Sequence, residues 1–296
     1  MSEREAQTGA AAVVVTHAGP SDLLRRCLVS LDRTARLHVV VVDNGDHDEL
    51  PTDAYGPGVD EVLRTENRGF GAAVNRGLAV VRAPGRPREP VMVLNDDVEV
   101  CDGWLGPLLE TLDADAGLGA VQPKLLLAGT EPPAINSLGV ATDRWGACAD
   151  VGHGEPDDGP TAGALPIEAF TGGAVLLRAA FLDDVGGFDE RYFLYYEDVD
   201  LSLRGAERGW RYACVPTSRV LHAASSSTAA LGEEVVYLRE RNRLLTCLRF
   251  RSPATIARGF WLGVRRLRHE PRRAHRRALA AALAAAPRQL LDRRHR

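Results

Sequence analysis

The amino-acid sequence predicts an α/β protein with a mostly parallel, Rossmann-like sheet and a helical C-terminal extension. Short, uninterrupted apolar runs recur through the first half of the chain, and this is the form that a strand takes when both its faces are covered. Helical patterns separate these runs, as is typical of a parallel sheet. After residue 232 the strand-like runs stop and arginine-rich helical segments follow.

The first half alternates strands and helices. The apolar run from Ala11 to Thr16 predicts a strand, and Ser21 begins a helix that runs to about Thr34, because a serine side chain caps a helix N-terminus well. The same patterns predict strands at 37–42, 59–64, 91–94 and 120–127, and helices at 69–81 and about 104–112.

The second half begins with irregular structure. Residues 129–166 are rich in Gly, Pro and Asp, which indicates loops with a hairpin around 135–149. Further on we expect a strand within 171–178, a helix at about 197–208, short strands at 211–215 and 219–222, and a helix at 233–250. Prolines 253, 271 and 287 are expected to divide the remainder into short helices. These patterns predict a main domain over 1–228 and an extension over 229–296.

The composition fits a cytoplasmic protein. Five cysteines are scattered without a CxxC pair, which suits a reducing compartment and argues against a disulfide framework. The segment Met1–Ala10 lacks the apolar core of a signal peptide, and no run reaches eighteen apolar residues.

The charge distribution is asymmetric. Residues 239–296 contain 17 arginines and three acids, whereas residues 1–238 contain 19 basic and 37 acidic residues. A basic tail on an acidic body is expected to meet something anionic. Nucleic acid is disfavoured, because the body is acidic and few aromatic residues interleave with the arginines.

The tail contains an amphipathic pattern with two open interpretations. An apolar stripe is formed by Ile256, Phe260, Trp261, Val264 and Leu267, with Arg258, Arg265, Arg266 and Arg268 largely around the rest. Such a helix suits an anionic membrane surface. The alternative is that the stripe packs on the main domain and leaves the arginines solvated.

Three predicted strands end in polar residues: Thr16-His17, Asp43-Asn44 and Asn95-Asp96-Asp97. Ligands bind beyond the carboxyl ends of strands in parallel sheets. The paired acids Asp96 and Asp97 form either an ordinary turn or a site for a divalent cation shared with a diphosphate. Asp43 either caps its strand end or accepts a bond from a pyrimidine base. His222 ends another short strand, as a structural residue or as a metal ligand that would suit Mn²⁺ at least as well as Mg²⁺.

The stretch 186–204 carries five carboxylates among five aromatic rings. Aromatic walls partly desolvate a carboxylate and raise its basicity toward what proton abstraction needs. Glu197 and Asp198 lie in the first turn of the predicted helix, where acids are also favoured for purely structural reasons. Asp200 and Arg204 have i,i+4 spacing, so Asp200 can equally be half of an ion pair on the helix surface.

Taken together, these residues resemble the family-2 inverting glycosyltransferases of the nucleotide-sugar-binding GT-A fold, and rhamnosyltransferases of cell-surface glycan assembly in particular. The segments that carry the resemblance are Val13–Thr16, Val41–Gly45, Glu66–Gly71 with Asn75–Gly77, Leu94–Asp97, Val121–Lys124, Gly186–Glu190, Tyr196–Leu201 and His222. The resemblance implies a nucleotide-sugar half at about 11–128 and an acceptor half at about 129–228.

The resemblance also implies residue roles. Asp198 matches the general base, with Glu197 beside it; Asp97 and His222 match the groups that hold Mn²⁺ or Mg²⁺. Asp96 is expected on the ribose side and Asp43 on the base. The remaining nucleotide-sugar residues are Thr16, His17, Asn44, Arg68, Gly69, Asn75, Asn95, Gly172 and Gly173. Asn95 stands where many members have Asp, and His17-Ala18-Gly19 replaces a Tyr-Asn-Arg opening, so the resemblance does not extend to nucleotide preference.

The activity implied is a single displacement from a UDP- or dTDP-sugar to a hydroxyl of a glycan or lipid-linked glycan. The enzyme would then work at the cytoplasmic face of the membrane, bound peripherally through the basic tail. Alternatives are a natural-product acceptor, a sugar nucleotidyltransferase, which would release pyrophosphate, or a non-catalytic binding relative.

Overall fold

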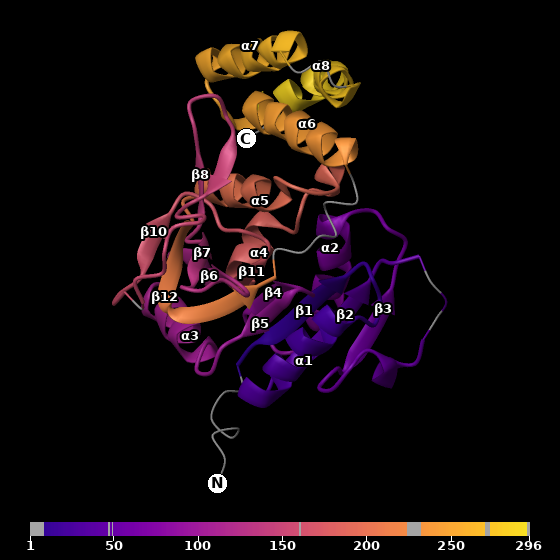
Figure 1. The fold of residues 1–296 in the computed structure, drawn as a ribbon, viewed down its shortest axis with the longest axis vertical. Helices are drawn as coiled ribbons and strands as arrows, with labels where there is room; N and C mark the ends of the chain where they lie inside the picture. Colours follow the sequence, from indigo (N-terminus) through magenta and orange to yellow (C-terminus); the bar gives the residue numbers. More distant parts are fainter. Residues whose placement is uncertain are drawn as a thin grey trace.

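The computed structural model describes residues 9–46, 48, 50–159, 161–223, 232–269 and 273–294. Its centre is a ten-stranded mixed sheet with the strand order β10-β12-β6-β11-β4-β1-β2-β3, to which β5 and β7 add on β12 and β6. Three C-terminal helices form a separate layer on one side of this sheet (Figure 1). The predicted fold class is therefore confirmed.

The four strands at one side of the sheet are parallel. Their bounds are β1 Ala11–Thr16, β2 His38–Asp43, β3 Glu61–Arg64 and β4 Val91–Asn95. Thr16 pairs with Asp43 on β2, and Val15 pairs with Asn95 on β4. The polar residues that follow these strands consequently meet at the same edge of the sheet.

The rest of the sheet is mixed. Its strands are β5 Val98–Val100, β6 Leu118–Leu127, β7 Ala134–Ser137, β10 Leu165–Ile167, β11 Ala174–Leu177 and β12 Arg211–His222. β11 runs antiparallel to both β4 and β6, while β12 runs parallel to β6. The two short strands predicted at 211–215 and 219–222 are wrong, because β12 is continuous. Its register with β6 shifts between Val215 and Arg219, and the proline at position 216 lies within this irregular part of the strand.

Helices cover both faces of the sheet and bury two separate apolar clusters. The first cluster contains apolar residues of α1 (Asp22–Thr34) and α3 (Leu105–Ala114). The second contains residues of α2 (Phe70–Val81), α4 (Ala179–Val185) and α5 (Glu197–Ala206). Single 3₁₀ turns occupy Thr52–Ala54 and Glu190–Tyr192. As predicted, Ser21 caps α1, and its Oγ accepts the N–H of Leu24 at 3.1 Å.

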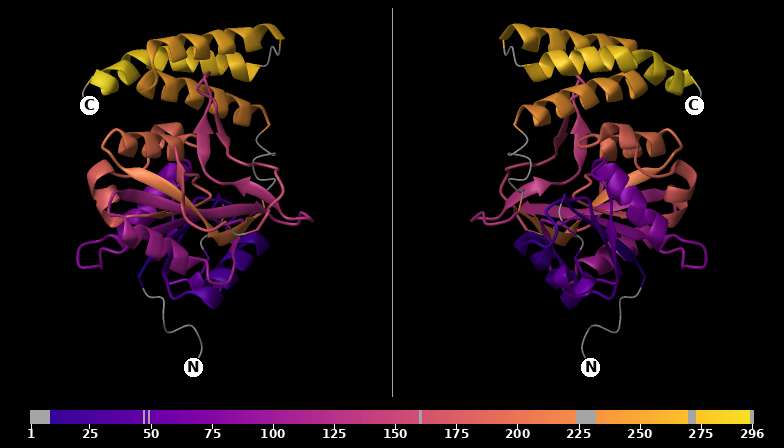
Figure 2. Two further views of the ribbon diagram at one scale, coloured as in Figure 1. Left: turned by 90° about the vertical axis from the view of Figure 1, so that its left-hand side faces the viewer. Right: turned by 90° about the vertical axis from the view of Figure 1, so that its right-hand side faces the viewer.

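The predicted hairpin is present as β8 (Val140–Thr142) and β9 (Cys148–Asp150), a two-stranded antiparallel pair. It rises from the sheet toward the helical layer (Figure 2). At its tip the carbonyl oxygen of Trp145 accepts a 2.7 Å bond from the buried guanidinium of Arg243. The hairpin therefore joins the sheet domain to the extension.

The extension consists of α6 (Glu233–Phe250), α7 (Pro253–His269) and α8 (Arg273–Arg294). The predicted break at Pro287 is wrong, because α8 continues through it. A proline inside a helix leaves the carbonyl four residues earlier without its amide partner. That residue is Leu283, an exposed residue of α8. Pro271 and the predicted boundary at 228/229 lie outside the described residues.

Part of the basic tail is neutralised by the chain itself. Glu240 is buried and pairs with Arg243 at 2.6 Å and also with Arg266. Arg251 pairs with Glu168 of the sheet domain at 2.9 Å. The apolar stripe predicted on α7 is only partly covered, because Trp261 and Val264 are exposed. Trp261 nevertheless stacks on Trp145 of the hairpin tip, with ring centroids 5.7 Å apart.

Within the described part of the chain, no helix is long and apolar enough to cross a membrane.

Candidate active site

The ends of β1, β2 and β4 bring four of the predicted site residues together. Thr16 Oγ1 donates a 2.6 Å hydrogen bond to Asp96 Oδ2, and the amide of Asn44 donates to the carbonyl of Thr16 at 3.0 Å. His17 Nδ1 lies 3.4 Å from the carbonyl oxygen of Asn44. Burial raises the pKa of Asp96, and the charge of Asp97 adds to this, while the bond from Thr16 opposes it.

Asp43 lies at this edge but is fully buried. Its Oδ2 accepts a 2.6 Å bond from the Tyr55 hydroxyl and lies 3.4 Å from Arg64, and its Oδ1 accepts the amide of Gly45 at 2.9 Å. Because the carboxylate is fully buried, a base could reach it only if the surrounding groups moved. In the structure Asp43 links Gly45, Tyr55 and Arg64, and its contact with a base stays a prediction.

The segment before α2 packs against the acidic stretch. Gly69 has a φ of 95°, and a Cβ there would lie 2.1 Å from the carbonyl oxygen of Phe193. Arg68 pairs with Glu190 at 3.2 Å. Asn75 holds the backbone of Phe188 with both of its side-chain polar atoms, at 2.8 and 2.9 Å. Asn75 and Gly69 thus hold α2 against the stretch 186–204, and their predicted contact with nucleotide sugar stays untested.

Asp97 and His222 are brought together from positions 125 residues apart. β5 pairs with β12 so that Val98 lies opposite His222, and the amide of Ala223 donates to the carbonyl of Asp97 at 2.9 Å. As a result, His222 Nε2 lies 3.1 Å from Asp97 Oδ1, and the two side chains are only 17% and 6% exposed. The pairing of these residues, which the sequence suggested only through a resemblance, is a feature of the fold.

This pair fits two neighbouring ligands of one cation. Two donor atoms about 2.1 Å from an ion and at right angles to each other lie about 3 Å apart. The donors are one imidazole nitrogen and one carboxylate oxygen, a set that accepts Mn²⁺ or Mg²⁺. Among the described residues no cluster of three or more His, Cys, Asp or Glu could hold a metal ion.

Two glycines connect this pair to the predicted general base. Gly172 donates its amide to Asp198 Oδ2 at 2.8 Å, and a Cβ on Gly173 would lie 3.8 Å from His222 Cε1. The carbonyl of Gly173 accepts the amide of Asn95 at 3.0 Å. The backbone at the start of β11 therefore lies between the ends of β4, α5 and β12.

Asp198 has the properties of a general base. Burial raises its pKa to about 6, and the charge of Asp150 adds to this rise, while the amides of Gly172 and Val199 hold the carboxylate and lower the pKa. A carboxylate with a pKa near 6 is ionised at neutral pH and is a stronger base than an ordinary aspartate.

Glu197 lies in a different environment from Asp198. Burial, together with the charge of Asp198, raises its pKa well above the ordinary value. The side chain is 5% exposed, and its Oε2 has no hydrogen-bond partner among the described residues. Burial in surroundings that leave Oε2 without a partner disfavours the charged form of this carboxyl, and this is the main cause of its raised pKa.

The turn before α5 is strained. Phe193, Tyr195 and Tyr196 have φ angles of 67°, 67° and 71°, which aromatic L-residues rarely adopt. The buried carboxamide of Asn242, on α6, compensates for this by donating to the carbonyls of Tyr192, Leu194 and Tyr195 at 2.9, 2.9 and 2.7 Å. Sequence reasoning missed Asn242, because nothing near it in the chain indicates that it contacts a turn 47 residues away.

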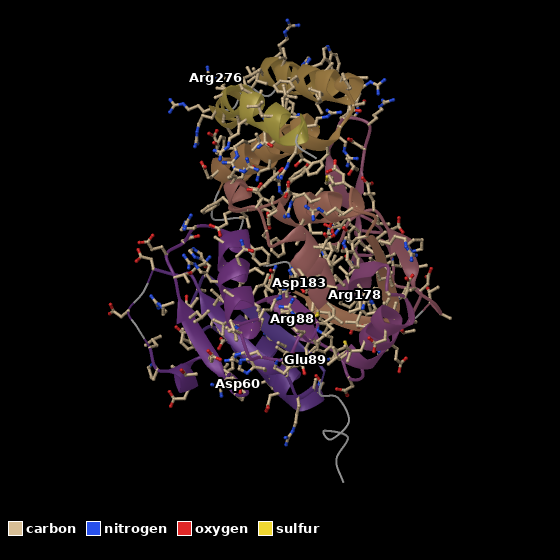
Figure 3. All side chains as sticks on the ribbon, turned by 180° about the vertical axis from the view of Figure 1, so that it is seen from behind. Asp60, Arg88, Glu89, Arg178, Asp183 and Arg276 are labelled. Carbon is tan, nitrogen blue, oxygen red and sulfur yellow. The ribbon has the colours of Figure 1, made fainter. Side chains whose placement is uncertain are left out.

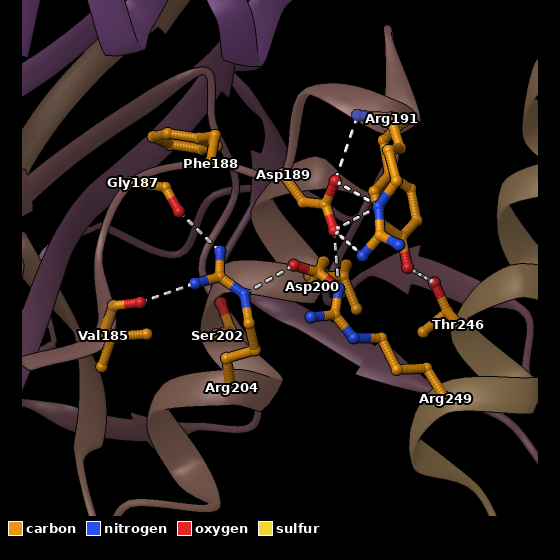
Figure 4. A network of polar contacts seen from close by, with 12 residues as sticks. Val185, Gly187, Phe188, Asp189, Arg191, Asp200, Ser202, Arg204, Thr246 and Arg249 are labelled. Atoms are coloured by element: carbon orange, nitrogen blue, oxygen red, sulfur yellow. Dashed lines mark hydrogen bonds and ion pairs between the residues drawn. The ribbon is translucent and has the colours of Figure 1, made fainter. Parts of the chain in front are cut away.

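Asp200 is half of an ion pair, as one reading of the sequence allowed, but the pair is buried and not on the surface. Its carboxylate is fully buried and accepts from Arg204 at 2.7 Å and from Arg249 of α6 at 2.5 Å. Arg249 also reaches Asp189 at 2.8 Å (Figure 4). This network fixes α6 to α5 and to the turn that precedes it, so the first helix of the extension supports the segment that contains Glu197 and Asp198.

Two further residues near the site come from the segment predicted to be irregular. Asp150 of β9 is close enough for its charge to raise the pKa of Asp198. Asn136 of β7 places its Oδ1 2.8 Å from His222 Nδ1. Only their polar character in a glycine-rich segment could have drawn attention to them.

The sequence is similar to known transferases. Residues 11–124 match the model of Glycosyl transferase family 2. A curated N-acetylglucosaminyl-diphospho-decaprenol L-rhamnosyltransferase of Mycobacterium tuberculosis is 33% identical over 236 residues, which cover 73% of this chain and 76% of that protein. A pre-mycofactocin glycosyltransferase of the same organism is 32% identical over 204 residues, 67% of this chain and 39% of its own length.

The fold is similar to solved GT-A glycosyltransferases. GalNAc-T7 with UDP, GalNAc and Mn²⁺ has a TM-score of 0.64 at 16% identity, covering 88% of this chain and 51% of that one. The mannosyltransferase PcManGT from Pyrobaculum calidifontis, in complex with GDP-Man and Mn²⁺, has a TM-score of 0.53 at 20% identity, covering 94% and 75%.

Proposed function

This chain belongs to glycosyl transferase family 2, and on that basis we propose that it transfers one sugar, with inversion, from a nucleoside-diphosphate sugar to an acceptor hydroxyl. The observation that carries the proposal is the position of Asp198. The start of β11 joins this carboxylate to the Asp97–His222 pair, so a base and a diphosphate-binding group would face one substrate.

In this reaction Asp198 takes the proton of the acceptor hydroxyl as its oxygen attacks the anomeric carbon. The bond from that carbon to the diphosphate oxygen breaks, and the nucleoside diphosphate leaves. The amides of Gly172 and Val199 keep Asp198 oriented, and the burial of Glu197 disfavours a second negative charge beside it. General-base help of this kind contributes about 10²- to 10⁴-fold.

The donor would lie along the edge formed by β1, β2 and β4. Thr16, His17, Asn44 and Asp96 would contact the nucleoside, and Asp97 and His222 would hold a divalent cation. Bound there, Mn²⁺ or Mg²⁺ supplies positive charge where negative charge develops on the leaving diphosphate.

For the substrates we propose an L-rhamnosyl donor and a polyprenyl diphosphate-linked glycan acceptor. The support is the similarity, over most of both chains, to a rhamnosyltransferase whose name gives a diphospho-decaprenol substrate. A small-molecule acceptor is the alternative, supported by the shorter match to the pre-mycofactocin glycosyltransferase.

We further propose that the extension holds the enzyme on an anionic membrane surface. Trp261 and Val264 of α7 are exposed beside the exposed side chains of Arg258, Arg265 and Arg268. Figure 3 shows charged side chains over the outside of the helical layer, Arg276 of α8 among them. Apolar side chains among cations suit the interface of an anionic bilayer.

The test is a screen of nucleotide sugars with a polyprenyl diphosphate N-acetylglucosamine acceptor and Mn²⁺. We expect a product whose mass increases by one deoxyhexose, together with a nucleoside diphosphate. Release of pyrophosphate from a nucleoside triphosphate would instead indicate a nucleotidyltransferase. Failure of every lipid-linked acceptor, with transfer to a soluble compound, would favour the alternative acceptor.

A further inference from the structure

We propose that Asn136 is a positioning residue that fixes the tautomer of His222, so that the Nε2 lone pair points to the metal position. This inference rests on the proposed function, in which Asp97 and His222 hold the cation. Asn136 is not itself expected to touch metal or substrate.

The contact is short and buried. Asn136 is 8% exposed, and its side-chain oxygen Oδ1 lies 2.8 Å from His222 Nδ1. An amide oxygen can only accept a hydrogen bond, so in this orientation of the carboxamide His222 donates from Nδ1. On the other side of Asn136, its carboxamide nitrogen faces His153 Nδ1 at 3.5 Å, and its backbone carbonyl oxygen lies 3.0 Å from the same ring nitrogen.

The tautomer decides what His222 can bind. With the proton on Nδ1, the neutral ring presents an unshared pair at Nε2, which lies 3.1 Å from Asp97 Oδ1. A lone pair and a carboxylate oxygen repel each other at this distance unless a positively charged group lies between them. With the opposite tautomer, Nε2–H would donate to Asp97 and no lone pair would face the site.

A bulge in the sheet directs Asn136 toward this histidine. On β6, Leu125 pairs with Ser137 and Leu126 with Ile135, so Asn136 is the extra residue of β7. His222 lies on β12, another strand that pairs with β6, and is opposite Leu127. Bulges change the direction in which a side chain points and are common beside functional sites. Here the bulge allows the carboxamide of Asn136 to contact the ring of His222.

An outer hydrogen-bond partner of this kind normally changes metal affinity by about 10- to 100-fold. We therefore expect Asn136→Leu, which has a similar size but no acceptor, to weaken the binding of Mn²⁺ by that factor. Asn136→Asp keeps an acceptor oxygen and should stay within a few-fold of wild type. Ser218→Ala is the control on the same strand as His222, because the buried Ser218 Oγ bonds to the carbonyl of Trp104 and not to His222.

The tautomer is measured on the full chain by ¹⁵N spectra of its histidine side chains at neutral pH, with His222→Gln used to assign the signal. We expect the proton on Nδ1 in wild type and in Asn136→Asp, and a mixture of tautomers in Asn136→Leu. Mn²⁺ affinity is measured by calorimetry on the same variants, with melting temperatures to confirm folding.

A wild-type His222 with its proton on Nε2 would overturn the inference. So would unchanged Mn²⁺ affinity in Asn136→Leu when His222→Gln binds Mn²⁺ weakly. If His222→Gln itself bound Mn²⁺ as well as wild type, the proposed metal site would be wrong, and the ¹⁵N tautomer would still decide whether Asn136 orients the ring.

Discussion

Asp198 Oδ2 accepts a 2.8 Å hydrogen bond from the amide of Gly172. The contact joins the first turn of α5 to the start of β11, where the next residue, Gly173, packs near His222. The backbone of Gly172 and Gly173 thereby links the Asp198 carboxylate to His222, which would help to bind the leaving diphosphate. Four predictions concern this arrangement, and a fifth concerns the extension.

Replacing Asp198 by Asn should abolish transfer and leave nucleotide binding nearly intact. The amide keeps the size of the side chain but cannot accept the acceptor proton, so turnover should fall by about 100-fold or more. Turnover is measured by product mass, nucleotide binding by calorimetry, and folding by melting temperature. Asp183→Asn, at an exposed ion pair with Arg82 and Arg88, is the control. More than about a tenth of wild-type turnover in Asp198→Asn would exclude Asp198 as the base.

The pH dependence of turnover should follow the ionisation of Asp198. Its pKa is raised to about 6, and a general base acts only when it is deprotonated. The rate constant should therefore fall as pH decreases through about 6 and level off above it. Rates are measured at saturating substrate in buffers from pH 5 to 8, with stability checked at each pH. A rate that stayed constant down to pH 5 would contradict the assignment.

Removing the carboxylate of Asp97 should eliminate the metal-dependent part of nucleotide binding. In Asp97→Ala, His222 alone would hold the cation, and the charge of the diphosphate would be poorly compensated. Calorimetry with UDP or dTDP should show that Mn²⁺ strengthens binding to wild type but hardly affects this variant. Glu99→Ala, two residues further along, removes an acid that pairs with Arg26 on the outer side of the sheet domain and serves as the control. An equal effect of Mn²⁺ on both proteins would reject Asp97 as a ligand.

Asn242→Ala should lower kcat by about tenfold or more while changing nucleotide affinity little. The variant frees the carbonyls of the strained turn that leads into Glu197 and Asp198, and a small misplacement of a catalytic group is costly.

Thr246→Val is the matched variant on α6, since it removes only a 3.2 Å contact with the Tyr192 hydroxyl. It should keep nearly normal kcat. If Asn242→Ala were folded, as judged by its melting curve, and turned over normally, the turn would not depend on α6.

Membrane binding should depend on α7 and α8. Full-length protein is expected to sediment with anionic vesicles, and salt should weaken this retention because it screens the arginines. A shortened chain ending near Ser252 keeps α6 and its contacts with the strained turn. Because it lacks α7 and α8, it should remain in the supernatant. The substitution Trp261→Ser within the full chain should reduce retention without truncation. Equal sedimentation of the long and short chains would exclude this role of the extension.

The sequence by itself determined most of the elements. Local signals suffice for these: Ser21 caps α1, apolar runs form β1 and β2, and α6 begins and ends where its pattern does. Each such signal acts between residues a few positions apart, so spacing along the chain contains it. The polar strand ends and the acidic first turn of α5 were visible for the same reason.

Only the tertiary structure decided how distant residues act on these groups. Asp200 appeared to be half of a surface pair, but Arg249 reaches it from 49 positions away and makes the pair a buried link to the extension. The bulge that directs Asn136 toward His222 depends on the register of two strands, and Asn242 supports its turn through backbone carbonyls. Backbone groups are the same in every residue, and register is set by packing over the whole sheet, so no pattern of neighbouring side chains specifies these contacts.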